Sequence, residues 1–357
     1  MSTIFHINML PARQGDCLWI EYGEEENPHR VIIDGGTTGT YPILHRHIDT
    51  LPKHKRRFEL LVVTHIDSDH IGGGLSLLSD ETSCVAFNDI WFNGWRHLPG
   101  SDLEEFGPVQ GEKLTTHLDK DELPWNKAFK CKSVVTPKTG DLPVKMLPGG
   151  LKLTLLSPGE DELNRLRPFW ENECRKAGLV PGHPPESSHP TPPGFEVMGL
   201  VNIDQLASSP YSSDDSRANG SSIALLAEYN DKRILLAGDA YADVLQENIL
   251  RLVPSGDLLH LDAFKLPHHG SKYNMSRGLL SILDCKRYLF STDGTQFKHP
   301  DHQAAARVIK FGGNCPKLLF NYRSAHNQLW DNAQWISQYG YSVRYPECGQ
   351  EGLVVEL

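Results

Sequence analysis

A segment of nine residues constrains this chain more than any other: it runs from Thr64 to Gly72 and reads THIDSDHIG. The residues before it, 60–63, form a short apolar run with β-branched members, which predicts a buried β-strand. The segment therefore follows the carboxyl end of a strand, where α/β folds place their reactive groups. Two histidines and two aspartates within six positions can bind one or two divalent metal ions. Asp and His also cap helices, but a cap needs one such residue and this segment has four.

Other predicted strands are also followed closely in the sequence by Asp, His or Gly. Hydrophobic patterns and turn residues predict strands at 3–10, 17–22, 30–34, 60–64, 85–92, 151–156, 223–228, 233–237, 263–266 and 287–291. Helices are predicted at 72–78, 112–122, 160–177, 242–252 and 301–309, and a closing hairpin at 342–357. The strand ends, or the loops just after them, carry Asp34, His65, Asp239, His268 and His299. A sheet whose strand ends meet at one edge would bring these side chains together.

The pattern of regular strands weakens between residues 94 and 218. Within this range, residues 181–193 are rich in proline and residues 208–216 in serine and aspartate, which predicts loops or disorder. We interpret 94–218 as an insertion or cap within a single domain that spans 1–357, and we find no internal repeat.

Composition and charge exclude some classes of protein. The 357 residues have a formal net charge of −10, so a nucleic-acid substrate would need a local patch to attract it. No apolar run approaches the length of a transmembrane helix, and the first ten residues lack the pattern of a secretory signal. The seven cysteines include no C-x-x-C pair, which indicates free thiols in a reducing compartment. We therefore expect a cytoplasmic protein that does not associate with membranes.

Several of these motifs together resemble the metallo-β-lactamase fold. The segment His65-x-Asp67-x-Asp69-His70 is similar to the H-x-H-x-D-H signature of that fold, with Asp67 in place of the second histidine. That replacement resembles one branch, the hydrolase domain of ComEC-type competence proteins, here as a free-standing chain. The same branch is similar to this chain at RQGDC (13–17), IDGG (33–36), NGSSI (219–223), LLAGD (235–239), LPHHGS (266–271) and HP (299–300).

The resemblance covers residues 3–80 and 219–307 and implies the fold class. We expect an α/β protein with a metallo-β-lactamase-like αββα sandwich, in which two mixed sheets are flanked by helices and interrupted by a large insertion. It also implies a metal-dependent hydrolase. Manganese or zinc is the metal we expect, with magnesium as an alternative, bound as one ion or two.

The resemblance further implies a set of metal ligands. One ion would be held by Asp69, His70, Asp239 and a histidine of the His268-His269 pair. Spacing does not decide between these two histidines; we favour His268 as the ligand and give His269 a role in substrate contact. A second ion would be held by His65, Asp67 and the bridging Asp239, which makes this site rich in oxygen. Asp34 would orient a ligand histidine through a hydrogen bond, or else serve as an ordinary turn residue.

Further residues are candidates for contact with substrate. Asp67 or Asp69 would take a proton from the attacking water. Asn219 and Ser222 could donate hydrogen bonds to a substrate oxygen or a water, or simply form a turn. His299 is a candidate for the leaving group or a phosphate, with a helix cap as the alternative. Lys272 is a candidate for contact with an anionic substrate, although a solvated surface lysine explains it slightly better.

Three hypotheses for function follow. The first is a phosphodiesterase or nuclease that acts on DNA or RNA through a metal-activated water. The second is a hydrolase of a small ester, thioester, lactone or phosphoester, which the acidic net charge favours. The third is a metal-binding sensor or partner module with little catalysis, which would bind a protein through 94–218. Aromatic residues that could stack on bases, or pack in the core instead, are Trp91, Trp95, Phe106, Trp125 and Trp170.

Overall fold

Two large β-sheets form the centre of the structure, a computed structural model that describes residues 2–98, 109–120, 122–176 and 201–357. The strands of the first sheet are β1 (Thr3–Met9), β2 (Leu18–Glu24), β3 (His29–Ile33), β5 (Leu60–Val62), β7 (Ile90–Trp91) and β18 (Leu353–Glu356). Their order is β18-β1-β2-β3-β5-β7. The first strands pair antiparallel, whereas β3, β5 and β7 run parallel, so the sheet is mixed.

The second sheet is larger and also mixed. Its strands are β8 (Val144–Met146), β9 (Lys152–Ser157), β10 (Ala224–Tyr229), β11 (Lys232–Leu236), β13 (Ala263–Lys265), β15 (Arg287–Phe290), β16 (Lys317–Phe320) and β17 (Ser342–Arg344). Their order is β17-β16-β15-β13-β11-β10-β9-β8. Two short pairs lie outside the sheets, β4 (Arg57–Phe58) with β6 (Ala86–Phe87) and β12 (Leu259–Leu261) with β14 (Leu283–Cys285).

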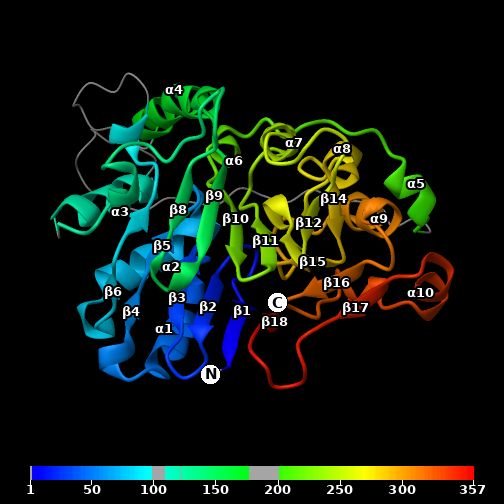
Figure 1. The fold of residues 1–357 in the computed structure, drawn as a ribbon, viewed down its shortest axis with the longest axis horizontal. Coiled ribbons are helices and arrows are strands. Elements are labelled where there is room, and N and C mark those ends of the chain that lie inside the picture. Colours follow the sequence, from blue (N-terminus) through cyan, green and yellow to red (C-terminus); the bar gives the residue numbers. More distant parts are fainter. Residues whose placement is uncertain (1, 99–108, 121, 177–200) are drawn as a thin grey trace.

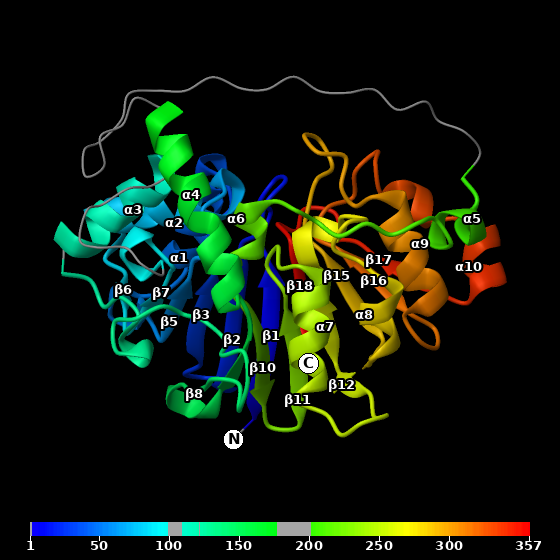
Figure 2. The same cartoon turned by 90° about the horizontal axis from the view of Figure 1, so that it is seen from above.

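Helices cover the outer face of each sheet, and Figure 2 shows α1 and α2 on the opposite flank from α9 and α10. The described helices are α1 (Tyr41–Asp49), α2 (Ser68–Ser79), α3 (Val109–Lys120), α4 (Glu160–Lys176), α5 (Ile203–Ala207), α6 (Arg217–Gly220), α7 (Ala242–Leu250), α8 (Arg277–Ser281), α9 (His302–Phe311) and α10 (Ala333–Tyr339). Among these helices, none is long and apolar enough to cross a bilayer.

The hydrophobic core is divided as a sandwich requires. One cluster lies between the two sheets and contains Leu60 and Val62 of β5 together with Leu225 of β10. Leu61, between those two residues of β5, belongs to a second cluster with α1 and α2. A third cluster packs α7, α8 and α9 against the other sheet. Because alternate side chains of a strand point to opposite faces, both faces of β5 are buried. The αββα sandwich of two mixed sheets is confirmed.

The range 94–218 contributes to the second sheet. Its strand β9 pairs with β10 from Ser157–Ala224 to Lys152–Glu228, and β8 pairs with β9. Part of the range expected as an insertion is therefore sheet, whereas α3 and α4 pack beside the first sheet. Residues 181–193 and Phe106 lie outside the described residues, and the four tryptophans considered for base stacking are buried in the core.

The hairpin predicted at 342–357 is wrong. Strand β17 pairs parallel with β16 in the second sheet, whereas β18 pairs antiparallel with β1 in the first, beside the N-terminal strand in Figure 1. Alternating apolar residues indicated two strands, but they carry no information about which partner each strand takes. Residues 345–352 therefore cross from one sheet to the other.

Candidate metal centre

The candidate ligands lie where strands of both sheets end. Asp34 follows β3, His65 follows β5, Asp239 follows β11 and His268 follows β13. Helix α2 begins at Ser68, four residues before the predicted start, so His70 lies in its first turn. Side chains from residues 34–70 and 214–299 therefore meet in one place.

Glycines bring α2 close enough to β3 to align His70 with Asp34. A Cβ atom on Gly73 would lie 2.0 Å from the carbonyl oxygen of Gly35, and one on Gly35 would lie 1.9 Å from the Gly74 nitrogen. Any larger residue at these positions would push the helix away. The Gly35 N–H donates to the His70 carbonyl oxygen at 2.8 Å, which fixes the first turn of α2 over the end of β3.

A buried carboxylate orients His70. Asp34 is fully buried and accepts hydrogen bonds from His70 Nδ1 at 2.8 Å and from the Thr64 N–H at 2.7 Å. The Thr64 hydroxyl donates to the same carboxylate at 2.8 Å. Because a carboxylate accepts only, His70 carries a proton on Nδ1 and directs Nε2 into the cluster. Asp34 thus occupies the orienting position that the sequence predicted for it.

Three further histidines direct Nε2 into the cluster in the same way. His65 Nδ1 lies 3.0 Å from the Thr64 hydroxyl oxygen, whose own proton points to Asp34. His269 Nδ1 donates to the Ser291 carbonyl oxygen at 2.9 Å. His268 Nδ1 lies 3.0 Å from Asn274 Oδ1. With Nδ1 committed in each ring, the Nε2 lone pairs are free to bind a metal.

Asp239 divides these histidines into two groups. Its Oδ1 lies 3.4 Å from His70 Nε2 and 3.7 Å from His269 Nε2, which we call the first pocket. Its Oδ2 lies 3.7 Å from His65 Nε2 and 3.9 Å from His268 Nε2, which we call the second pocket. One buried carboxylate therefore faces two pairs of imidazole nitrogens, one pair on each oxygen.

The two aspartates of the opening segment lie one beside each pocket. Asp69 Oδ2 is 3.7 Å from His269 Nε2, and Asp67 Oδ2 is 3.6 Å from His65 Nε2. The Asp69 side chain is largely buried, whereas that of Asp67 is 43% exposed and faces solvent. The structure thus brings together all six residues that the sequence analysis named as ligands.

The order within the His268-His269 pair differs from the one we favoured. The structure brings His269, rather than His268, next to His70, with 3.1 Å between their Nε2 atoms. Both residues of the pair have left-handed backbone angles, with φ of 46° and 54°. This turn sends the second side chain inward, where it is 1% exposed, and leaves the first 26% exposed. As a result, the second pocket has two imidazoles, those of His65 and His268, whereas only His65 was predicted there from the sequence.

The geometry fits a metal ion. With Nδ1 protonated in both rings, the Nε2 atoms of His70 and His269 would present two lone pairs to each other. His65 Nε2 and Asp239 Oδ1 are buried without any hydrogen-bond partner. Ligand–metal distances of about 2.1 Å require ligands to lie roughly 3.0–3.4 Å apart in octahedral or tetrahedral coordination. The distances from His70 Nε2 to His269 Nε2 and to Asp239 Oδ1, 3.1 and 3.4 Å, match these values, whereas His269 Nε2 lies 3.7 Å from the same Asp239 oxygen.

The electrostatics of the cluster also favour a cation. Burial opposes a charge on His70, but the carboxylates of Asp239 and Asp34 outweigh it and raise the pKa of His70 well above its ordinary value. Burial likewise opposes a charge on Asp239, but His70, His269 and His268 hold the pKa of Asp239 well below its ordinary value. The pocket therefore stabilises positive charge next to Asp239, as a proton or as a metal ion.

A buried ion pair lies behind the first pocket. Asp16 and Lys265 are almost completely inaccessible, and the Lys265 ammonium donates to Asp16 Oδ2 at 2.6 Å. The other Asp16 oxygen lies 3.5 Å from His269 Nδ1. Together with His70, Asp239 and His269, Asp16 forms a group whose candidate ligand atoms lie within 4.8 Å of one another. Lys265 and His269 keep the pKa of Asp16 low despite its burial.

Asn219 and Ser222 contact the ligand histidines rather than open space. The Asn219 amide donates to Asp214 at 2.8 Å and lies 3.2 Å from His268 Nδ1. The Ser222 hydroxyl accepts from the Asp239 N–H at 2.9 Å and lies 3.4 Å from His65 Nδ1. Both residues are buried, so in this arrangement they support ligands.

His299 and Lys272 lie at the margin of the cluster. The His299 ring is 5.0 Å from the His268 ring, and its buried Nδ1 has no hydrogen-bond partner. Burial, and then the neighbouring His268 and His269, lower the pKa of His299 well below its ordinary value, so its ring is neutral. The Lys272 ammonium lies 5.1 Å from the Tyr273 ring centre.

Four residues that support the cluster were not predicted from the sequence: Asp16, Asp214, Lys265 and Asn274. Asp214 lies in the Ser/Asp-rich stretch 208–216, where it accepts from the side chains of Asn219 and Asn274 at 2.8 and 2.9 Å. That stretch is a loop, as predicted, but it is held by these hydrogen bonds. Asp16 could have been noticed as an acidic residue between Gly15 and the apolar run that begins at Cys17.

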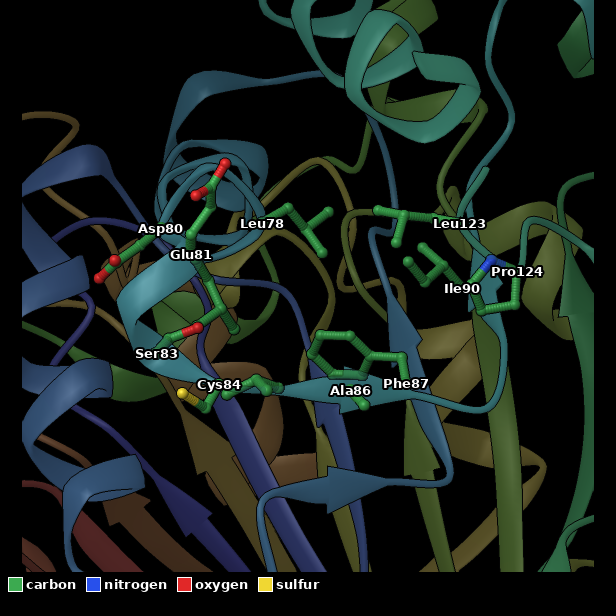
Figure 3. Close-up of a pocket in the computed structure, with 12 residues that line it drawn as sticks. Leu78, Asp80, Glu81, Ser83, Cys84, Ala86, Phe87, Ile90, Leu123 and Pro124 are labelled. Atoms are coloured by element: carbon green, nitrogen blue, oxygen red, sulfur yellow. The ribbon is translucent and has the colours of Figure 1, made fainter. Parts of the chain in front are cut away.

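An apolar hollow of about 340 Å³ lies elsewhere, between the end of α2 and β6. In Figure 3 the side chains of Leu78, Phe87, Ile90 and Leu123 point toward one another there. It shares no residue with the metal cluster, and its Asp80 carboxylate accepts hydrogen bonds from Thr82 and Tyr41.

No family model matches the chain, and no curated protein matches its sequence. Among solved structures, the metallo-β-lactamase fold protein YhfI from Bacillus subtilis is 10% identical with a TM-score of 0.43, covering 99% of this chain and 100% of YhfI. The MIM-2 metallo-β-lactamase is 13% identical with a TM-score of 0.31, covering 85% and 86%. CmlA, a diiron β-hydroxylase from Streptomyces venezuelae, is 11% identical with a TM-score of 0.40, covering 100% and 54%. All three TM-scores lie below 0.5, and identities this low carry no information about substrate or activity.

Proposed function

We propose that this protein is a metal-dependent hydrolase of the metallo-β-lactamase type that cleaves phosphodiesters, with DNA or RNA as the substrate class. The observation that carries the proposal is Asp239, which directs each oxygen toward a separate pair of histidines. A carboxylate shared in this way is suited to two neighbouring ions. Two-ion sites are typical of enzymes that displace an oxygen at phosphorus.

We assign the ligands from this geometry. His70, His269 and Asp69 would hold one ion with Oδ1 of Asp239, and His65, His268 and Asp67 would hold the other with Oδ2. When bound, such ions lower the pKa of a water molecule and stabilise negative charge on the attacking and leaving oxygens. Four imidazoles and three carboxylates favour zinc or manganese over magnesium, because magnesium prefers oxygen ligands.

The remaining residues position the ligands and handle protons. Asp34, Asn274 and the Ser291 carbonyl hold His70, His268 and His269 in the tautomer that binds through Nε2. Asp67, the more exposed of the two aspartates, is the better candidate to accept a proton from the attacking water. Neutral His299, at the edge of the second pocket, can donate a hydrogen bond to a leaving oxygen. Lys272 remains a predicted contact for an anionic substrate.

The test combines metal content with cleavage of single-stranded DNA and RNA in manganese, zinc or magnesium. We expect close to two equivalents of metal in the wild type and cleavage with manganese or zinc. Asp69→Ala combined with His70→Ala should lose metal from the first pocket and all cleavage, whereas His260→Ala, at an exposed histidine outside the cluster, should behave as wild type. Cleavage that survives the double substitution would overturn the proposal.

The alternatives predict different results from the same assay. Bound metal with hydrolysis of bis-p-nitrophenyl phosphate or an ester, and no cleavage of DNA or RNA, would indicate a hydrolase of small substrates. Bound metal without turnover of any substrate, together with a protein that co-purifies, would indicate a sensor or partner module.

A further inference from the structure

A polar cavity of about 350 Å³ is lined in part by Ser68, the residue between the candidate ligands Asp67 and Asp69 in the chain. It is lined by hydroxyl, amide and guanidinium groups and by Gly39, and none of its lining residues is acidic. The groups come from four segments: the β1–β2 loop, the loop after β3, the first residue of α2 and the loop after β15. The residues that matter here are Arg13, Gln14, Thr37, Thr38, Ser68 and Gln296.

Close packing joins this cavity to the metal centre. A Cβ atom on Gly15 would lie 1.7 Å from the Asp69 carbonyl oxygen, so the β1–β2 loop rests directly on the segment that carries the candidate ligands. Ser68, which lines the cavity, lies between Asp67 and Asp69 in the chain. The cavity therefore borders the segment that carries the candidate ligands Asp67 and Asp69.

Arg13 is held in position without an acidic partner. Its backbone is in the left-handed region, with φ of 58°, its N–H donates to the Tyr322 hydroxyl at 2.7 Å, and its carbonyl oxygen accepts from the Asp293 N–H at 2.8 Å. The guanidinium carbon lies 2.8 Å from where a Cβ atom on Gly39 would be, so the side chain extends over the loop after β3. Within the described part of the chain, no ion pair involves Arg13. The guanidinium is therefore available to a ligand.

A hydrogen bond orients the amides of the cavity. Gln14 Nε2 donates to Gln296 Oε1 at 2.8 Å and links the β1–β2 loop to the loop after β15. This bond leaves one proton of the Gln14 amide and the NH₂ group of Gln296 able to donate hydrogen bonds to a ligand. The hydroxyls of Thr37, Thr38 and Ser68 line the same cavity. One cation with several neutral donors is the set that recognises a single anionic group of tetrahedral shape.

We propose that this cavity binds a phosphate group of the substrate next to the one that is hydrolysed. This inference rests on the proposed phosphodiesterase function and adds to it: the preferred substrate carries at least two phosphates, as an oligonucleotide does. The net charge of −10 repels polyanions overall, so a local cation is needed where the chain meets the substrate. Arg13 supplies that charge beside the metal centre.

The experiment compares thymidine dinucleotides that carry a 5′-phosphate, a 3′-phosphate or no terminal phosphate. For wild type, one terminal phosphate should lower KM by about tenfold, the effect of one charge-assisted contact. Arg13→Gln should remove this advantage. Arg233→Gln, at an exposed arginine at the start of β11, should retain it. Gln296→Glu, which adds a negative charge at an exposed position, should remove it as well.

A second measurement separates the phosphate-cavity proposal from the phosphodiesterase proposal. It is the binding of inorganic phosphate, by calorimetry, to the full chain after a chelator has removed its metal. We expect binding that both cavity variants weaken by at least about tenfold. If dinucleotides are cleaved and the variants match wild type, the phosphate cavity is refuted and the hydrolase proposal stands. If no dinucleotide is cleaved but phosphate binding depends on Arg13, the cavity stands and the phosphodiesterase proposal fails. If phosphate does not bind, or binds equally to wild type and all variants, the proposal that this cavity binds phosphate is refuted.

Discussion

The buried pair of Asp16 and Lys265 should show strong energetic coupling. Lys265 is 0% and Asp16 2% exposed in their side chains, and 2.6 Å separates the ammonium from the carboxylate. Lys265→Met preserves the length of the side chain but leaves the Asp16 carboxylate buried without its cation. Breaking a buried pair in this way typically costs about 3–5 kcal/mol of unfolding free energy.

The double variant should recover most of that loss. Asp16→Leu together with Lys265→Met replaces the pair with apolar groups of similar volume, a change that is often neutral or stabilising. We expect the double variant to lie within about 1 kcal/mol of wild type, so the costs of the two single variants should be strongly non-additive.

The assay is urea unfolding followed by tryptophan fluorescence at pH 7, with metal chelated so that ligand binding does not contribute. All four proteins of the double-mutant cycle are measured under the same conditions. Two results would refute the reasoning: a cost below about 1 kcal/mol for Lys265→Met alone, or a double variant no more stable than that single variant.

Three further predictions concern metal and pH. Asp239→Asn should reduce bound metal below one equivalent by elemental analysis, because both pockets use this carboxylate; two retained equivalents would contradict the assignment. Asp34→Asn should weaken metal binding by about 10–100-fold in competition with a chelator, since it no longer holds the His70 tautomer; an unchanged affinity argues against that role. Burial, with Arg96 nearby, lowers the pKa of His97 from 6.5 to about 3. The unfolded chain therefore binds a proton below pH 6.5 that the native state does not, so stability should fall by about 1.4 kcal/mol per pH unit between pH 6 and 4. His97→Phe should reduce that slope in urea unfolding, and identical slopes would exclude His97 as its source.

The sequence predicted the strand ends well because each depends on local chemistry. The run 60–63 has alternate residues in two clusters on opposite faces, which only a strand buried on both sides allows. Polar groups can follow such a run only where the strand ends. The pattern of apolar runs and polar ends was therefore enough to identify His65, Asp239 and His268 as neighbours.

The start of α2 and the order of the histidine pair depended on contacts between distant residues. The glycines 72–74 suggested a helix start, yet they lie inside α2 because Gly35 packs against them and leaves no room for side chains. Likewise, the left-handed turn at His268 and His269 decides which ring faces His70. Neither fact can be obtained from the spacing of residues along the chain.

The partners of buried polar groups were also beyond the sequence. Lys265 lies in the apolar strand β13, and its partner Asp16 is about 250 residues away in the chain. Similarly, the pattern of 342–357 indicated two strands but could not show that they join different sheets. Local composition reports that a residue is buried, whereas its partner is set by tertiary packing.

The division of the ligands between the two ends of the chain has a consequence for folding. His70 and His269, whose Nε2 atoms lie 3.1 Å apart, are separated by 199 positions in the sequence. An ion held by both would act as a cross-link between the two halves of the sandwich and would close a very long loop. Such a link removes chain entropy from the unfolded state in the way that a disulfide does, most strongly for long loops. The metal centre would then stabilise the fold as well as provide a reactive site, and removal of the metal should lower the free energy of unfolding.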